Sequence, residues 1–442
     1  MHSTERLRGI AAWGALLTGL GFFASCKRVE VPLLQTRLNA PAVTGVGVRA
    51  STLGKGAAAP APGASRRRFG DVGLGSVGAN HEVGQPVTVG NLAVFPIYAK
   101  RQLELGRFTT LSAALQAGTA EVREVRLKAS ASRQAVRRAP PRRIPPAGQN
   151  AHRGGLPLTV INKDSSGDVN VSVSGGGAQV NRLVIDNRGD VPILVLAGTV
   201  VKGGKQDRQI AQDFVVGPKK RVAVDAFCVE RGRWNGNRAG KATGGRFTTV
   251  DSLANLDVRN AAQHDSSQSL VWQNVAETNK DNNVRSGSGT LMATLDNVEL
   301  RRRRQKLLAQ LTAGLGRMPH PRRIVGLAYA VEGRVRSVRW FFNRAVFLKF
   351  QKVLLTTAAL EGLTARARAR RRGAPAGRPV VAAVGDVTAF IRSFAQPTRR
   401  KRRATDGLND NYYRGNARGN QSITVLRSEG ADNPVSVDFS AK

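Results

Sequence analysis

Residues 169–173 read VNVSV and residues 191–201 read VPILVLAGTVV, and these two stretches decide the fold class. In the first, valines alternate with polar residues, which is the period of two typical of a half-buried strand. The second is apolar at both parities and favours a central strand. Residues 180–185 repeat the pattern of the first stretch, and residues 187–190 (NRGD) have the composition of a turn. The region therefore predicts several short strands in succession.

The pattern continues toward Trp234. Further strands are expected at 208–216 and 221–229, separated by Gly217 and Pro218. Short strands joined by turns at this spacing indicate an antiparallel sheet, either a sandwich or a partial barrel. Strands and helices do not alternate regularly, and no glycine-rich dinucleotide fingerprint follows a strand, so a Rossmann-type enzyme is disfavoured.

Elements on both sides of this region complete an expected α+β fold. Glu332 and Gly333 form the centre of a predicted hairpin, and Gly118 is placed to end a helix. The fold class is thus an antiparallel β-rich core with a C-terminal hairpin and a packed helix, flanked by disordered basic segments. The expected strands are 92–98, 120–127, 324–331 and 334–341, and the expected helices are 110–117, one around 270–275, and 347–363.

The charge is distributed unevenly. The 442 residues include 69 Lys and Arg against 30 Asp and Glu, for a formal net charge of +39. Residues 151–300 hold 18 basic and 15 acidic side chains, as an ordinary folded domain does, whereas residues 301–442 hold 30 and 8. Runs of arginine repel one another, stay solvated and attract polyanions. Two interpretations stay open: solvated linkers of biased composition, or flanks that bind an anionic polymer.

Composition also predicts the domain boundaries. Residues 27–85 are rich in Ala, Pro and Gly and predict a flexible tether. The β-rich domain is expected at 86–365, with a basic, proline-rich insertion at 133–147 as an exposed loop. Residues 366–442 are expected to be a basic, largely disordered tail, although 380–391 is apolar enough for one more helix or strand.

The first 26 residues resemble an export signal. Arg6 and Arg8 precede an apolar stretch at 9–24, and Cys26 follows small residues. Sixteen helical residues span roughly 24 Å, which is shorter than the hydrocarbon core of a bilayer. We expect a bacterial lipoprotein signal with lipidation at Cys26, which anchors the protein to a membrane of the cell envelope. A secreted or periplasmic protein without lipid, and an uncleaved anchor, are the alternatives.

No metal or cofactor is expected. Two cysteines do not form a disulfide framework, and Cys228 shares strand parity with apolar residues, so it is expected to be buried and inert. The histidines are scattered and have no metal-ligand spacing. They are His2, His81, His152, His264 and His320.

Two irregular motifs carry a family resemblance. Residues 203–208 read GGKQDR, and residues 227–234 read FCVERGRW. Together with the strand at 92–96, the helix at 111–118 and the hairpin and helix at 324–363, they make residues 85–365 similar to the ARG and Rhodanese-Phosphatase-superfamily-associated Protein domain. The family has no established biochemical function. Its name implies an association with nucleotide or ADP-ribose metabolism.

The same motifs supply the candidate ligand-binding residues, which are Lys205, Gln206, Asp207, Arg208, Glu230, Arg233 and Trp234. A guanidinium beside a glycine turn suits a phosphate or carboxylate, and an indole can stack on a base. A structural interpretation is equally coherent: the glycines make a bend, a carboxylate pairs with an arginine, and Trp234 covers the sheet end. No residue is assigned a catalytic role.

Three functions follow from the sequence. The first is an exported, lipid-anchored domain that binds a ligand or partner. The second is a binder of nucleic acid, anionic glycan or anionic lipid through the basic flanks, with affinity that falls with salt. The third is an enzyme that processes nucleotides or ADP-ribose. The sequence favours the first and identifies neither the ligand nor the oligomeric state.

Overall fold

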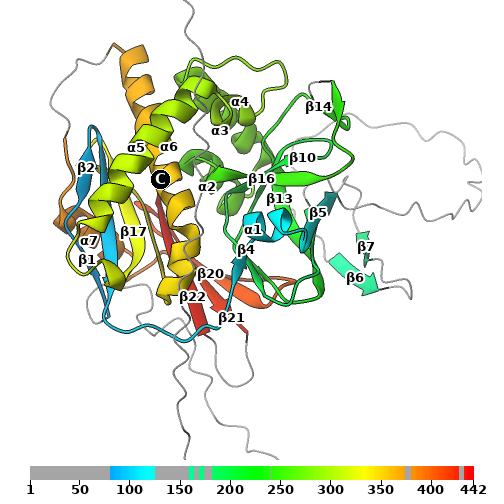
Figure 1. The fold of residues 1–442 in the computed structure, drawn as a ribbon, viewed down its shortest axis with the longest axis horizontal. Coiled ribbons are helices and arrows are strands. Elements are labelled where there is room, and N and C mark those ends of the chain that lie inside the picture. Colours follow the sequence, from blue (N-terminus) through cyan, green and yellow to red (C-terminus); the bar gives the residue numbers. More distant parts are fainter. Residues whose placement is uncertain are drawn as a thin grey trace, which may run out of the picture. The chain divides into compact units, whose positions relative to one another are not determined.

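The computed structural model describes residues 80–124, 159–163, 169–173, 182–238, 240–373, 380–427 and 433–442. The predicted leader at 1–26, most of the tether and the proline-rich insertion at 133–147 lie outside the described residues. The described residues form an α+β structure with a β-rich core, as the sequence predicts (Figure 1). None of the described helices is both long and apolar enough to cross a membrane.

The largest sheet has nine strands within the described residues and runs in the order β1-β3-β17-β18-β22-β21-β20-β19, with β2 also pairing with β3. Its strands are antiparallel throughout. They are β1 (His81–Val83), β2 (Val87–Val89), β3 (Leu92–Ala99), β17 (Ile324–Val331), β18 (Arg334–Phe341), β19 (Arg399–Ala404), β20 (Asn409–Gly415), β21 (Gly419–Leu426) and β22 (Asn433–Ala441).

Smaller sheets come from the middle of the chain. The six-stranded sheet contains β16 (Phe247–Leu253), β10 (Thr199–Gly203), β11 (Arg208–Ile210), β13 (Lys220–Cys228), β8 (Arg182–Asn187) and β5 (Ala120–Glu124), in that order. A three-stranded sheet contains β12 (Phe214–Val216), β9 (Ile193–Val195) and β4 (Thr109–Thr110). Two short hairpins are β14 (Asn237–Arg238) with β15 (Lys241–Ala242) and β6 (Thr159–Lys163) with β7 (Val169–Val173).

The helices cover the sheets. They are α1 (Leu111–Gln116), α2 (Leu256–Gln263), α3 (Gln268–Asp281), α4 (Met292–Leu295), α5 (Val298–Gly316), α6 (Arg344–Arg371) and α7 (Val384–Arg392). Helices α5 and α6 lie side by side, and α6 also contacts β16 and β17 (Figure 1). Helix α6 begins after Asn343, whose side chain accepts hydrogen bonds from the first-turn amides and so caps the helix.

Strand β3 separates two hydrophobic cores. Leu92 and Val94 pack with α6, whereas Phe95 and Ile97 pack with α7 on the opposite face. Successive side chains of a strand point to opposite faces, so an apolar run such as LAVFPIYA fits a strand that is covered on both sides. This arrangement places α6 and α7 on opposite faces of the nine-stranded sheet.

The hairpin of β17 and β18 has the predicted bounds. Glu332 and Gly333 occupy the turn with φ angles of 52° and 75°. Positive φ at both central residues is the geometry of the tight turns that match the twist of two paired strands. Asn91 fixes this end of the sheet, because its side-chain amide donates to the carbonyl oxygen of Gly362 in α6, at 3.1 Å.

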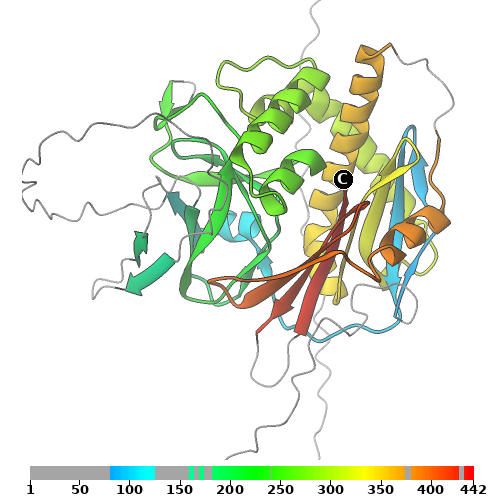
Figure 2. The same cartoon turned by 180° about the vertical axis from the view of Figure 1, so that it is seen from behind.

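The prediction of a largely disordered tail after Ala365 is wrong. Helix α6 continues to Arg371, α7 forms at 384–392, and β20, β21 and β22 lie inside the nine-stranded sheet beside β18 (Figure 2). Many side chains buried on these strands are polar, including Asn411, Thr424 and Asp438, so the sequence shows no apolar alternation there. The domain also starts earlier than residue 86, because β1 pairs with β3.

Two long strands predicted in the middle of the chain are broken. The apolar run at 191–201 forms β9 and β10, which belong to different sheets, with Gly198 between them at a φ of 84°. The stretch at 208–216 divides in the same way into β11 and β12. An uninterrupted apolar pattern does not reveal where a chain crosses from one sheet to the next.

Candidate functional site

The two motifs predicted to form a site do come together. The turn after β10 holds residues 203–207, and the end of β13 and the loop after it hold residues 228–234. Gln206, Asp207, Arg208, Glu230 and Arg233 are buried, at 0–9% exposure. Lys205 is exposed and so is Trp234, whose indole N–H donates to the carbonyl oxygen of Arg231. Five of the seven candidates therefore share one buried polar cluster.

Asp207 is the centre of this cluster. Its Oδ1 accepts from the Gly203 amide at 3.0 Å, and its Oδ2 accepts from the Thr290 hydroxyl at 2.8 Å. Arg238 donates to both carboxylate oxygens, and Arg233 Nη2 lies 3.4 Å from Oδ1. Both oxygens of the buried carboxylate are thus used inside the protein.

Glu230 is also fully bound. Its Oε2 accepts from the Asp207 amide at 3.1 Å and from Arg233 Nε at 2.9 Å. Its Oε1 accepts from the Ser288 hydroxyl at 2.7 Å. Arg233 further donates to the carbonyl oxygen of Gly204 at 2.7 Å. Buried carboxylates that are paired and hydrogen-bonded at each oxygen hold loops in place, and this geometry favours a structural role for Asp207 and Glu230. Buried Arg208 differs, because its Nε has no hydrogen-bond partner among the described residues.

Gly203 is needed at the centre of the turn. It has a φ of 141°, and a Cβ added there would lie 2.1 Å from the carbonyl oxygen of Arg246. Cys228 is buried as predicted and receives a contact from Arg208. Burial raises the pKa of its thiol, which opposes thiolate formation. Ligand binding at GGKQDR and FCVERGRW stays a prediction.

A second buried polar cluster was not predicted. Arg339 on β18 lies between Asp213, at 3.0 Å, and Asp438 on β22, at 3.1 Å. Asp213 Oδ2 also accepts from the hydroxyls of Thr424 and Ser436. The two carboxylates hold the pKa of Arg339 above its ordinary value, despite the burial that opposes its charge. These residues are dispersed over 226 positions of the sequence and form no motif, so only the folded structure brings them together.

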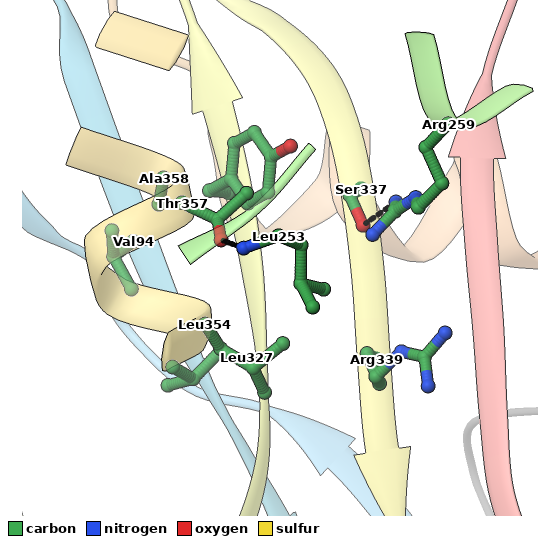
Figure 3. Close-up of a pocket in the computed structure, with 10 residues that line it drawn as sticks. Val94, Leu253, Arg259, Leu327, Ser337, Arg339, Leu354, Thr357 and Ala358 are labelled. Atoms are coloured by element: carbon green, nitrogen blue, oxygen red, sulfur yellow. Dashed lines mark hydrogen bonds between the residues drawn. The ribbon is translucent and has the colours of Figure 1, made fainter. Parts of the chain in front are cut away.

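A small cavity of about 20 Å³ lies beside this cluster (Figure 3). Arg259 and Arg339 lie on one side of it, across from Leu354 and Ala358 of α6 (Figure 3). Leu253 also lines the cavity, and its amide donates to the Thr357 hydroxyl at 2.9 Å. The other lining residues are Val94, Leu327, Tyr329 and Ser337.

A larger pocket, of about 340 Å³, is formed by α1, β10, β16 and α6. Small-molecule pockets are typically of about 300–1,000 Å³ with an apolar lining and a few polar groups. The apolar part of this pocket is lined by Leu194, Leu253, Phe350 and Val353. The hydroxyl groups belong to Thr110, Ser112, Thr199, Thr249 and Ser252, and the charged residues are Asp251, Lys349 and Lys352. None of the seven candidates from the sequence lines it.

Several polar groups in this pocket have no partner in the described part of the chain. Ser252 is 1% exposed, and its Oγ forms no hydrogen bond there. Lys349 and Lys352 are exposed at the pocket and form no ion pair with another described residue. Asp251, in contrast, is paired with Arg304 at 3.0 Å. The unpaired charge in the pocket is therefore positive.

Local geometry places these groups. Lys349 and Lys352 are three residues apart on α6 and so lie on one face of the helix. Thr199 lies where the pairing of β10 with β16 is irregular. Such irregularities change which face of the sheet a side chain points to, compared with regular alternation. Sequence reasoning missed the pocket because its lining comes from segments near residues 110, 195, 250 and 350 that carry no common motif.

The fold and these sites define an α+β domain with a β-rich core and a polar, cation-bearing pocket. The chain belongs to the family of the ARG and Rhodanese-Phosphatase-superfamily-associated Protein domain, whose model matches residues 154–430. This confirms the family predicted from the two motifs, and the match extends beyond Ala365 into the C-terminal strands. No curated protein and no solved structure matches the chain.

Proposed function

We propose that this protein is a binding protein for a small anionic molecule, which occupies the pocket between α1, β10, β16 and α6. The observation that supports this most is the pair Lys349 and Lys352, two cations without an ion-pair partner in the described part of the chain, beside a pocket of about 340 Å³. A phosphate or carboxylate of the ligand lies against these ammonium groups. Its less polar part lies on Leu194, Phe350 and Val353.

The hydroxyl groups extend this recognition. Ser252 has a buried hydroxyl without a partner, and an unpaired buried polar group is unfavourable by roughly 1–3 kcal/mol. A ligand that hydrogen-bonds to Ser252 removes this penalty. Thr199 already donates to the carbonyl oxygen of Leu196, so its oxygen is available as an acceptor for a ligand hydroxyl. The proposed class is a small molecule with one anionic group and several hydroxyls.

Thermal unfolding with a panel of compounds tests the proposal. The panel contains ADP-ribose, AMP, glucose 6-phosphate, citrate and, as a neutral control, glucose. We expect at least one anionic compound to raise the unfolding temperature of the wild-type protein, and the Lys349→Ala/Lys352→Ala variant to lose most of that shift. The matched control is Lys100→Ala/Lys306→Ala, which removes two exposed lysines outside the pocket.

If the control variant loses the shift as completely as the pocket variant, general charge attraction explains the binding and the pocket proposal is refuted. The same samples are analysed for product formation from ADP-ribose and AMP. Turnover that depends on Asp207 or Glu230 would favour the alternative of a nucleotide- or ADP-ribose-processing enzyme.

We further propose that the protein is exported and anchored to a bacterial membrane through lipid at Cys26. The support is the sequence before Cys26, which has a charged start, an apolar middle and small residues before the cysteine. Metabolic labelling with a fatty-acid analogue tests it. The wild-type protein should be labelled and should sediment with membranes. The Cys26→Ser variant should not be labelled and should not sediment with membranes. Equal labelling of both proteins would refute the anchor.

A second function, binding of an anionic polymer, is supported by strand β19. Its sequence RRKRRA places five cations in a row on an edge strand of the nine-stranded sheet. Arg402 pairs with Asp410. Edge strands with many cations also prevent unwanted strand pairing, so the charge has a structural explanation as well. Affinity for DNA or an anionic glycan that falls steeply with salt, and that is reduced in Arg399→Gln/Arg400→Gln/Lys401→Gln, would support this function.

A further inference from the structure

The interior cavity in Figure 3 holds more hydrogen-bond donors than the described protein groups satisfy. Arg259, Tyr329 and Arg339 line it, at 2–7% exposure. Arg259 Nε, Arg339 Nη2 and the Tyr329 hydroxyl are buried without a hydrogen-bond partner in the described part of the chain. An arginine side chain only donates hydrogen bonds, so whatever satisfies these two guanidinium groups must be an acceptor.

No carboxylate of the described residues is hydrogen-bonded to Arg259. Its hydrogen bond to a side chain is the one to the neutral Ser337 hydroxyl, at 3.3 Å. The carboxylate of Asp438 is 3.9 Å away and already accepts from Arg339. A buried cation is unfavourable unless it is paired and hydrogen-bonded. Asp213 and Asp438 do not line the cavity, and the charged residues that line it are Arg259 and Arg339.

We propose that this cavity is a binding site for a single small monovalent anion of the halide class, with chloride as the physiological occupant. Arg259, Arg339 and Tyr329 donate to the anion, and Ser337, which accepts from Arg259, directs its own hydroxyl hydrogen toward it. The volume of about 20 Å³ admits one particle of this size, since a cavity needs about 10–15 Å³ to hold one water. Phosphate and organic anions are too large.

The protein is shaped around the side chain of Arg259. Gly198 has a φ of 84°, and a Cβ added there would lie 2.8 Å from Cδ of Arg259. Leu253, which is 2% exposed, lines both this cavity and the 340 Å³ pocket and separates them. The anion site is thus distinct from the proposed ligand pocket and does not depend on it.

Thermal unfolding of the full chain in different sodium salts tests the proposal. Chloride, bromide and gluconate are compared at equal ionic strength, about 150 mM, which keeps charge screening the same. Gluconate does not fit the cavity. We expect the unfolding temperature in chloride and bromide to exceed that in gluconate by at least about 2 °C, because an anion bound only by the folded state stabilises that state.

The difference between salts should disappear in Arg259→Gln and persist in Arg285→Gln, which removes the same charge from an exposed site. Crystals grown in sodium bromide give an independent readout: an anomalous peak in the cavity is expected. Equal unfolding temperatures in the three salts, or density for water without an anomalous signal, would overturn the proposal. Because both readouts use the wild-type protein, they decide the question even if Arg259→Gln does not fold.

Discussion

Phe439 on β22 tests whether the C-terminal segment is part of the folded core. Its side chain is fully buried and lies 5.4 Å from the ring of Trp340 and 5.2 Å from that of Phe394, measured between centroids. Phe439→Ala removes the ring and leaves a cavity beneath α7. Phe→Ala at a buried site lowers the free energy of unfolding by about 3–5 kcal/mol.

Urea unfolding followed by circular dichroism and tryptophan fluorescence measures this change, and Trp340 reports on the altered site directly. Phe439→Leu fills part of the space and should lose only about 1–2 kcal/mol. The control is Val380→Ala, at a side chain that is 70% exposed and should stay within about 0.5 kcal/mol of the wild type. If Phe439→Ala also stays within about 0.5 kcal/mol, β22 is not packed as described and the reasoning fails.

Three further changes follow from buried groups. Asp213→Asn removes a carboxylate from buried Arg339 and should lower the free energy of unfolding by about 3–5 kcal/mol in urea titrations; a loss below about 1 kcal/mol would mean that the pair is exposed to water. Burial lowers the pKa of His81 to about 4 from its ordinary 6.5, so the folded state disfavours the charged imidazole and stability falls as the pH drops from 6.5 to about 4. His81→Phe should remove up to about 3 kcal/mol of this pH dependence. The measurement is the free energy of unfolding at several pH values. If this free energy depends on pH in the variant as it does in the wild type, the burial of a neutral histidine is contradicted. Gly203→Ala should lower the unfolding temperature more than Gly90→Ala does. Both glycines have positive φ, but only at Gly203 would an added Cβ meet a backbone carbonyl oxygen, at 2.1 Å. Equal decreases in the unfolding temperature would show that the turn at Gly203 relaxes easily.

The sequence predicts the helices and strands whose buried side chains are apolar. The hairpin at 324–341 follows from two apolar runs around Glu332 and Gly333, and β3 follows from LAVFPIYA. Helix α6 is predicted from apolar residues on one face, although its last two turns are arginine-rich and extend past the predicted end. In each case a local pattern coincides with the local structure.

The sequence does not predict the strands whose buried side chains are polar. Strands β20 to β22 bury Asn, Ser, Thr and Asp side chains against Arg339 and its neighbours, and such residues are typical of loops. The 340 Å³ pocket escapes for a different reason, because Thr110, Thr249 and Lys349 are ordinary surface residues until the fold assembles them. The GGKQDR and FCVERGRW motifs identify the family correctly, and their buried residues form one polar cluster in which both carboxylates are paired.

The strand order of the nine-stranded sheet has a consequence for synthesis of the protein. Strand β18 (Arg334–Phe341) lies between β17 and β22 (Asn433–Ala441), so its partner on one side comes from a segment much later in the sequence. At the other end, Asn91 bonds to Gly362, 271 residues away. The chain must therefore be synthesised through β22 before the sheet can close, and until then β18 and β21 each have an open edge. Nascent chains that stop short of β22 are expected to associate with one another and to depend on chaperones or proteases for removal.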